Sequence, residues 1–225
     1  MGAQAIPPIV VHRLKQYFPD MQYSTDYGLS ETSGPGPIYL GVDNEHKIGA
    51  IGKATIMWDA RIVDDNGRDV NQGEVGELIL KGDGVMREYY KNPELTTESI
   101  RKGWLYTGDL AKMDDDGFIF LVDRKKDLVI SGGENIFPVE VEEIIQKHPK
   151  VYDVAVIGTP DERLGEIVTA VIQAISGETL SKEEINVFCE ENLPRYKRPR
   201  SIIFDTVPRS ATGKIEKPKL RKLYC

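Results

Sequence analysis

The strongest constraint on the fold is a run of five charged residues near the middle of the chain, residues 123–127, which is followed by a short apolar run and a glycine pair. Five successive charges cannot lie in an apolar core unless each is paired and hydrogen-bonded. We therefore expect them at a surface, a cleft or a domain boundary. Residues 128–130 predict a short strand, and Gly132 and Gly133 permit backbone conformations and close approaches that a side chain would forbid.

Length and composition indicate a globular protein of one or two domains. The 225 residues are 40% hydrophobic and 29% charged, which is enough for a sizeable core. The net charge of −7 argues against a general nucleic-acid surface, although residues 195–200 form a local basic cluster. No apolar run is long enough for a membrane span, and the N-terminus lacks the pattern of a secretion signal. With only Cys189 and Cys225, we expect no disulfide framework and a cytoplasmic location.

The first 122 residues predict one helix followed by short strands and turns. Residues 5–18 combine two early prolines with apolar residues at helical spacing. From residue 48 to residue 122, strand-like runs alternate with turns that contain Asn66-Gly67 or Asp116-Gly117, which are strong hairpin signals. This region is therefore predicted to be a small, mostly antiparallel barrel or sheet.

The last 100 residues predict a compact α+β domain. Pro138 opens a helix, residues 151–157 and 167–175 read as strands, and Ser181 with Glu184 has the spacing of a capping box at the start of a second helix. Cys189 lies on the apolar side of that helix, so we expect it in the core rather than as a nucleophile. A last strand over residues 201–207 and a short terminal helix complete an α+β fold.

Two clusters carry groups suited to a nucleotide. Tyr27-Gly28-Leu29-Ser30-Glu31 offers an aromatic face for a planar base and a carboxylate that could hold magnesium with substrate phosphates. As an isolated pentapeptide it is a weak signal, and the residues alone favour an ordinary loop. Residues 103–109 end in Asp109, whose carboxylate could accept the two hydroxyls of a ribose or could simply cap a turn.

Two further clusters carry positive charge. Arg124 lies in the charged segment, and Lys214 follows a flexible glycine in the loop of residues 208–214. This loop is not a phosphate-binding loop, because Pro208 replaces the first required glycine and Ile215 replaces the required Ser or Thr. On its own, Lys214 reads as a solvated surface lysine.

Together, in this order, the four clusters resemble the adenylate-forming superfamily of acyl-CoA synthetases, luciferases and peptide-synthetase adenylation domains. Residues 73–78, 89–96 and 193–197 match further motifs of that superfamily. The resemblance covers nearly the whole chain. It identifies the chain as similar to the C-terminal portion of an AMP-forming acid:CoA ligase.

The resemblance implies roles for the nucleotide-binding residues. Tyr27, within the motif that includes Gly28, would stack on or flank the adenine, and Gly2 with Ala3 would border it. Ser30, where relatives usually have Thr, keeps the hydroxyl that contacts the α-phosphate. Glu31 would bind Mg²⁺, and the ribose hydroxyls would be held by Asp109 and Arg124.

It also implies roles for the C-terminal residues. Lys126 matches the hinge, the CoA pantetheine tunnel would be lined by Ser131, Gly132 and Gly133, and Lys214 would orient the carboxylate and the α-phosphate. An anionic carboxylate attacks an anionic phosphate in this reaction, so positive charge is needed where they meet, and a lysine on a flexible arm suits that position. After the adenylate forms, the C-terminal domain of relatives turns about the hinge, so that one site serves two half-reactions.

The domains implied are a truncated large AMP-binding domain over residues 1–124, a hinge at 125–126 and a mobile domain over 127–225. Within the first, residues 1–47 would be the remnant of an α/β subdomain and 48–124 a β-rich subdomain. The phosphate loop that relatives carry upstream is missing. We therefore expect the isolated chain not to adenylate acids at a normal rate, and residues 1–47 to be rearranged, disordered or covered by another chain.

The function implied is conversion of a carboxylate and ATP to an acyl-adenylate, followed by acyl transfer to CoA, with Mg²⁺ as cofactor. A fatty or aryl acid is the expected substrate, with no nucleic acid, and a separate N-terminal half or a second copy is the possible protein partner. An amino-acid adenylation domain is an alternative, disfavoured because no carrier segment follows residues 223–225. The third hypothesis is a non-catalytic remnant that binds a nucleotide or CoA.

Overall fold

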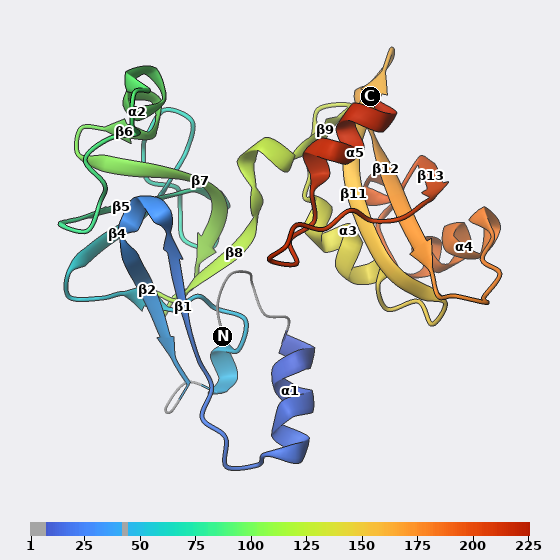
Figure 1. Cartoon of the computed structure of the whole chain (residues 1–225), viewed down its shortest axis with the longest axis horizontal. Coiled ribbons are helices and arrows are strands. Elements are labelled where there is room, and N and C mark those ends of the chain that lie inside the picture. The colour runs from blue at the N-terminus through green and yellow to red at the C-terminus, as the bar shows by residue number, and fades with distance from the viewer. Residues whose placement is uncertain (1–7, 42–44) are drawn as a thin grey trace. The chain divides into compact units, whose positions relative to one another are not determined.

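The computed structural model describes residues 8–41 and 45–225, which form two compact units, Met1–Val122 and Asp123–Cys225 (Figure 1). Each unit has buried apolar clusters of its own. Gly2 and Ala3 lie outside the described residues. Among the described helices, none is long and apolar enough to cross a membrane.

The first unit begins with a helix, α1 (Pro8–Tyr17), and a small antiparallel sheet. The helix confirms the expectation for this segment as far as the described residues reach. The strands follow in the order β1 (Ser24–Leu29), β2 (Gly34–Leu40) and β3 (Lys53–Ala54), with the 3-10 turn η1 (Ser30–Thr32) between the first two. They are held by an aromatic cluster in which the Tyr39 ring lies 5.5 Å from that of Tyr23 and 6.3 Å from that of Phe118.

A five-stranded sheet forms the rest of the first unit, and its first four strands pair antiparallel, as predicted. A short helix, α2 (Pro93–Ser99), precedes its third strand. The strands are β4 (Trp58–Val63), β5 (Gly76–Gly82), β6 (Ile100–Arg101), β7 (Trp104–Met113) and β8 (Ile119–Arg124). Their order is β4-β5-β7-β6, with β8 also on β7.

The tight turns of this sheet follow from their Asp and Gly residues. Asp64 Oδ1 accepts the backbone N–H groups of Asn66 and Arg68, and Gly67 adopts a φ of 75°. Asp114 accepts the N–H groups of Asp116 and Phe118 in the same way. Such side-chain acceptors replace ladder bonds where the chain reverses, and they confirm the predicted hairpins.

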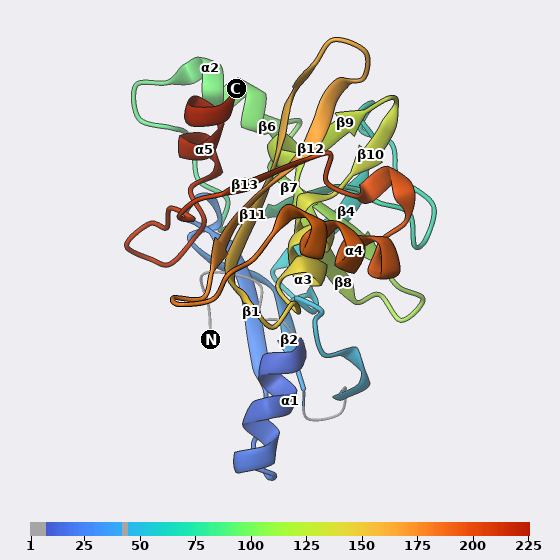
Figure 2. The same ribbon diagram turned by 90° about the vertical axis from the view of Figure 1, so that its right-hand side faces the viewer.

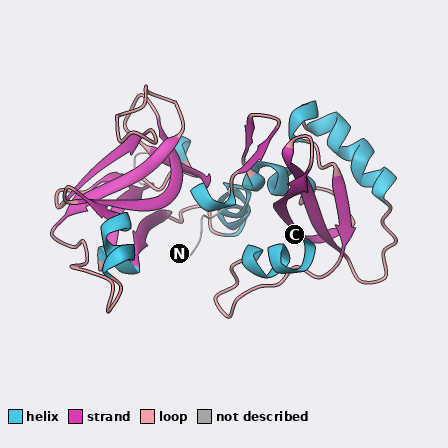
Figure 3. Ribbon diagram, turned by 90° about the horizontal axis from the view of Figure 1, so that it is seen from above, coloured by secondary structure: helices cyan, strands magenta, loops and turns pink. Residues whose placement is uncertain are grey.

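The second unit is a five-stranded sheet with helices on both faces (Figures 2 and 3). The central pair, β11 (Val151–Asp161) and β12 (Gly165–Ala174), is antiparallel, and β13 (Ser201–Phe204) pairs with β12 in parallel. A short hairpin, β9 (Val129–Ser131) and β10 (Glu134–Ile136), extends the sheet from β12. These elements confirm the predicted α+β class.

Alternation along the central strands directs side chains to two cores. Val154 and Val156 face a cluster that includes residues of α3 (Pro138–Ile145) and α4 (Lys182–Asn192). Ala155 and Ile157 face the opposite cluster, which includes Leu220 of α5 (Lys217–Tyr224). Because successive strand residues point to opposite faces, a continuous apolar strand is explained by burial on both sides. Cys189 of α4 is 1% exposed, as expected for a core residue.

Candidate functional site

The Tyr27 hydroxyl donates to Asp109 Oδ2 at 2.6 Å, which joins two of the predicted nucleotide-binding clusters in the first unit. Tyr27 comes from β1 and Asp109 from β7, and each is 7% exposed. A hydrogen bond to a carboxylate in a buried setting is stronger than one between neutral groups. The pair therefore fixes the orientation of the Asp109 side chain and joins two sheets that are far apart in sequence.

Asp109 lies on an irregular part of β7. The pairing register with β5 shifts between Glu77 and Ile79, and Gly108 adopts a φ of 72°. Thr107 Oγ1 donates to the Leu78 carbonyl at 2.6 Å and accepts the Asp109 N–H at 3.1 Å. The Gly108 N–H is bound by Glu77 Oε1 at 3.1 Å. The Thr-Gly-Asp sequence thus makes a bulge, a device that re-aims a side chain out of a regular ladder.

The Tyr-Gly-Leu-Ser-Glu cluster runs from β1 into η1 and is not the ordinary loop that the residues alone favoured. Gly28 is required by close packing, because a Cβ added there would lie 2.5 Å from the Gly34 carbonyl oxygen. Ser30 opens η1, and its carbonyl accepts the Ser33 N–H at 3.3 Å. Thr32, which sequence reasoning did not single out, is buried and accepts the Leu29 N–H at 2.9 Å.

Glu31 is held by a residue that received no site role from the sequence. Its Oε1 accepts the Tyr89 hydroxyl at 2.7 Å, and its carbonyl accepts the Met86 N–H at 2.7 Å. Burial and the bond to Glu31 raise the pKa of Tyr89, so the phenol stays protonated as a donor. Within the described residues, no group of three or more His, Cys, Asp or Glu side chains converges to hold a metal ion. Glu31 alone fits Mg²⁺ only as one ligand beside substrate phosphates and water.

The charged segment divides into buried and exposed residues at the start of the second unit. Asp123 and Asp127 are 8% exposed, whereas Arg124, at the end of β8, and Lys126, in the turn η3 (Lys125–Asp127), are exposed. Asp123 accepts the N–H groups of Arg124 at 2.7 Å and of Val139 at 2.9 Å. Burial raises the pKa of its carboxyl. Asp127 Oδ1 accepts no hydrogen bond from the described residues but lies 2.8 Å from Arg221 Nη2 as an ion pair, so each buried carboxylate has a compensating group, as the free energy of burying charge requires.

Ser131, Gly132 and Gly133 lie at the tip of the β9–β10 hairpin. Ser131 ends β9, and the glycines form a two-residue turn with φ values of 60° and 87°. Positive φ at both central residues is what a tight hairpin demands, and glycine adopts it without steric cost. The Gly132 N–H donates to the Leu164 carbonyl at 3.0 Å, so the exposed tip is tied to the loop between β11 and β12.

Lys214 is exposed on a turn between β13 and α5. The Ser210 N–H donates to the Lys214 carbonyl at 2.8 Å, and the Gly213 N–H donates to the Ser210 carbonyl at 2.9 Å. Gly213 has a φ of 83°. Beside this turn, sequence reasoning missed two ion pairs, Arg209 with Asp153 and Lys217 with Glu142. The two residues of each pair lie at least 56 residues apart in the chain, so no local sequence pattern indicates the contact.

Comparison with known proteins matches both units to one family. The model of the AMP-binding enzyme covers residues 1–90, and that of the AMP-binding enzyme C-terminal domain covers residues 140–214. A long-chain-fatty-acid–CoA ligase, FadD13, of Mycobacterium tuberculosis is 42% identical over 199 residues, which are 88% of this chain and 39% of that protein. A 2-succinylbenzoate–CoA ligase of Bacillus cytotoxicus is 36% identical over 223 residues, 99% of this chain and 45% of that protein.

Solved structures agree with these matches. The o-succinylbenzoate CoA synthetase of Bacillus subtilis, in complex with an acyl-adenylate intermediate, has a TM-score of 0.88 at 31% identity and covers 98% of this chain and 45% of that one. ATP-bound MatB of Rhodopseudomonas palustris has a TM-score of 0.83 at 35% identity, covering 89% and 40%. The chain thus spans between 39% and 45% of the length of these relatives.

Proposed function

The chain belongs to the AMP-binding enzyme family, and from this premise we propose that it is the C-terminal portion of an AMP-forming acid:CoA ligase. One observation carries the proposal most directly. The chain's fold is similar to that of a CoA synthetase solved with its acyl-adenylate, at 31% identity and a TM-score of 0.88. Two of the relatives are named as ligases of a long-chain fatty acid and of 2-succinylbenzoate, which supports a fatty or aryl acid as substrate.

The reaction we propose has two steps. A carboxylate oxygen of the acid attacks the α-phosphorus of ATP, and the bond from that phosphorus to the pyrophosphate oxygen breaks, which gives acyl-AMP and pyrophosphate. The CoA thiolate then attacks the acyl carbon, and AMP leaves with the electron pair of the broken C–O bond. Lys214 serves the first step by placing its charge between the two anions, where charge neutralisation lowers the barrier.

The first unit would provide much of the nucleotide contact. Asp109, oriented by Tyr27 at 2.6 Å, is suited to accept a ribose hydroxyl. Gly28 and Ser30 follow Tyr27 closely in the chain, and we assign Ser30 to the α-phosphate. Glu31, held by the Tyr89 hydroxyl, is assigned to Mg²⁺, which would screen the phosphate charge when bound.

The second unit would provide the remaining contacts. We assign Arg124 to the ribose, Lys126 to the hinge, and the hairpin tip with Ser131, Gly132 and Gly133 to the pantetheine of CoA. The exposed position of the glycine turn supports the last assignment, because backbone without side chains allows a narrow thiol arm to approach closely. Gly2 and Ala3, which belong to the first unit, keep their proposed place beside the adenine.

Calorimetric titration of the 225-residue chain with AMP tests the nucleotide assignment. We expect saturable binding that Asp109→Ala weakens at least about tenfold, because one good hydrogen bond to a charged group accounts for about that factor. Asp59→Ala is the matched control, since Asp59 is an exposed aspartate of the same unit. Equal weakening by both variants would contradict the role of Asp109. Titration with CoA in place of AMP tests the second unit, and a chain that binds neither ligand would favour the inert remnant.

A further inference from the structure

The turn that carries Lys214 has little apolar packing of its own. Residues 211, 212 and 214 are exposed, and the turn is closed by backbone bonds between Ser210 and Lys214 and between Gly213 and Ser210. Arg209 and Ile215 form an isolated antiparallel bridge at its base. These bonds fix the shape of the turn. They do not fix where the turn lies relative to the sheet of the second unit.

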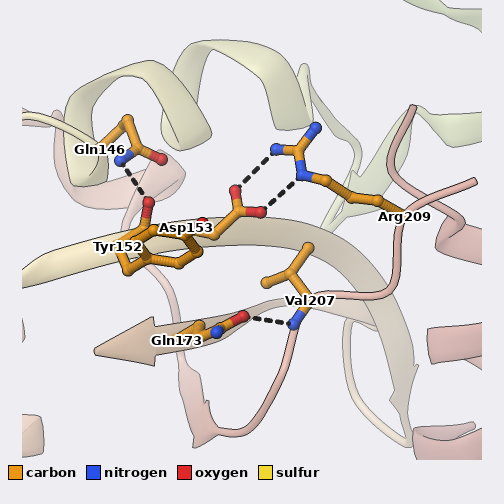
Figure 4. Close-up of a pocket in the computed structure, with 6 residues that line it drawn as sticks. All are labelled: Gln146, Tyr152, Asp153, Gln173, Val207 and Arg209. Carbon is orange, nitrogen blue, oxygen red and sulfur yellow. Dashed lines mark hydrogen bonds and ion pairs between the residues drawn. The ribbon is translucent and has the colours of Figure 1, made fainter. Parts of the chain in front are cut away.

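A guanidinium group adds a polar link from the turn to that sheet, beside the packing of Ile215 against the apolar cluster that includes Ala155 and Ile157. Arg209 Nε lies 2.6 Å from Asp153 Oδ2, and its Nη2 lies 2.8 Å from Asp153 Oδ1, which is a bidentate pair (Figure 4). The third nitrogen, Nη1, donates to the Gly213 carbonyl at 2.6 Å. Asp153 belongs to β11, so Arg209 joins the residue before Lys214 to the central strand of the sheet. The planar fork of arginine allows these three bonds at once, whereas a lysine ammonium lacks that geometry.

The carboxylate that receives Arg209 is itself rigid. The Asp153 side chain is 10% exposed, and its Oδ1 also accepts the Val154 N–H at 2.9 Å. The pair forms part of the wall of a shallow pocket of about 510 Å³, which Gln146, Tyr152, Gln173 and Val207 also line (Figure 4). Within the pocket, Gln173 Oε1 of β12 accepts the Val207 N–H at 3.2 Å. The segment that leads to Arg209 is therefore tied to the sheet as well.

The segment that leaves the turn has a buried anchor. Lys217, at the start of α5, pairs with Glu142 of α3 at 2.8 Å, with side chains 8% and 13% exposed. Both stems of the turn are thus fixed, one through Gln173 and one through Glu142. Between the stems, the Arg209 side chain links the Gly213 carbonyl in the turn to Asp153 in the sheet.

We propose that Arg209 is a positioning residue for Lys214, acting through the bridge from Asp153 to Gly213. The proposal rests on the proposed function, since it takes Lys214 as the lysine of the adenylation step. Displacement of a reacting group by about 1 Å can cost about a hundredfold in rate, so a shift of the backbone that carries Lys214 lowers the rate of adenylation. Because thioester formation does not use Lys214 in this scheme, the bridge matters for the first half-reaction alone.

Amide hydrogen exchange on the full chain tests the bridge without any reference to activity. We expect Arg209→Lys, which keeps the charge and loses the fork, to raise exchange at Gly213 and Lys214 at least tenfold, with the thermal midpoint nearly unchanged. Asp153→Asn, which weakens the same bridge from the other side, should reproduce the effect. Arg198→Lys is the control, because Arg198 also bonds two backbone carbonyls but at the end of α4. Unchanged exchange at Gly213 and Lys214 in both bridge variants would overturn the proposal.

The half-reactions, measured separately in a hybrid in which this chain replaces the matching portion of the M. tuberculosis long-chain-fatty-acid–CoA ligase, test the consequence for Lys214. ATP–pyrophosphate exchange reports adenylation, and acyl-CoA formation from supplied acyl-adenylate reports the second step. We expect Arg209→Lys to lower kcat for adenylation at least tenfold, with the KM for the acid and the second step unchanged. Equal loss in both steps, or no loss with increased exchange, would refute a positioning role. Absence of both reactions in a folded hybrid that carries the unmutated chain would instead count against the proposed function, and the amide exchange on the 225-residue chain would then decide the bridge alone.

Discussion

Glu142 and Lys217 form an ion pair of 2.8 Å in which neither side chain is more than 13% exposed. Glu142 Oε1 also accepts the Val156 N–H at 2.7 Å. Burial raises the pKa of Glu142, and the Lys217 charge opposes that rise. Asp127, next to the proposed hinge residue Lys126, forms a second ion pair with α5. Its Oδ1 lies 2.8 Å from Arg221 Nη2, although the geometry is not that of a hydrogen bond. Charged residues of α5 thus compensate carboxylates that would otherwise be buried alone.

Glu142→Gln should destabilise the second unit. Removal of one member of a buried pair leaves the other charge uncompensated, which typically costs roughly 3–5 kcal/mol. Urea denaturation, followed through the unfolding transition of the second unit, measures the change in its free energy of unfolding. Glu142→Leu combined with Lys217→Met removes both charges and should recover much of the loss. A Glu142→Gln variant as stable as the wild type would show that the pair is not buried as described.

The two cysteines should differ in reactivity. Cys225 is exposed, whereas Cys189 is 1% exposed and burial raises the pKa of its thiol to about 11. Since the thiolate is the reactive form, a disulfide reagent at pH 8 should modify one thiol rapidly and the second only on unfolding. Cys225→Ser should abolish the rapid phase. Rapid modification of two thiols in the native protein would contradict the packing of α4.

Local sequence signals predicted the elements whose ends are fixed by neighbouring residues. Ser181 and Glu184 form the expected capping box, and the Asp-Gly turns form the expected hairpins. The strands of the first small sheet were missed, because Pro35 and Pro37 interrupt the pattern of β2 and proline lowers the strand propensity of a run. The Tyr27–Asp109 bond spans 82 residues, so neither the contact nor the fixed orientation of Asp109 could be derived from spacing.

The start of α4 gives a test of pH dependence. Lys150, bonded at 2.6 Å, together with the Ser181 N–H lowers the pKa of Glu184 to about 2 from its ordinary 4.5. A carboxyl with a lowered folded-state pKa contributes stability that is present above pH 4.5 and is lost as the pH falls toward 2.

Glu184→Gln keeps a capping box, because glutamine also serves at that position, and removes the ion pair. We expect the variant to unfold at a lower temperature than the wild type at pH 6, with the difference shrinking progressively between pH 4.5 and pH 2. Thermal unfolding at a series of pH values measures the difference. A difference that does not change with pH would mean that the effect comes from capping rather than from charge.

At the scale of the whole molecule, the proposed site residues are divided between the two units. Tyr27, Glu31 and Asp109 belong to Met1–Val122, and Arg124 and Lys214 belong to Asp123–Cys225. The division falls next to the charged segment, which supports a hinge at Lys126 as a proposal. The family could be identified from motifs alone, because their order along the chain is distinctive. The acid substrate could not be predicted, because the motifs are assigned to the nucleotide and the CoA thiol and not to the acid.

The most direct test of the central claim is acyl-CoA formation by a hybrid ligase. In this hybrid, the chain replaces the matching portion of the M. tuberculosis long-chain-fatty-acid–CoA ligase, to which it is 42% identical over 199 residues. The account predicts ATP-dependent formation of acyl-CoA from a fatty acid, with adenylation lost in Lys214→Ala while thioester formation from supplied acyl-adenylate persists. A folded hybrid that binds ATP and the acid yet forms no acyl-adenylate, or one that is unaffected by Lys214→Ala, would contradict it.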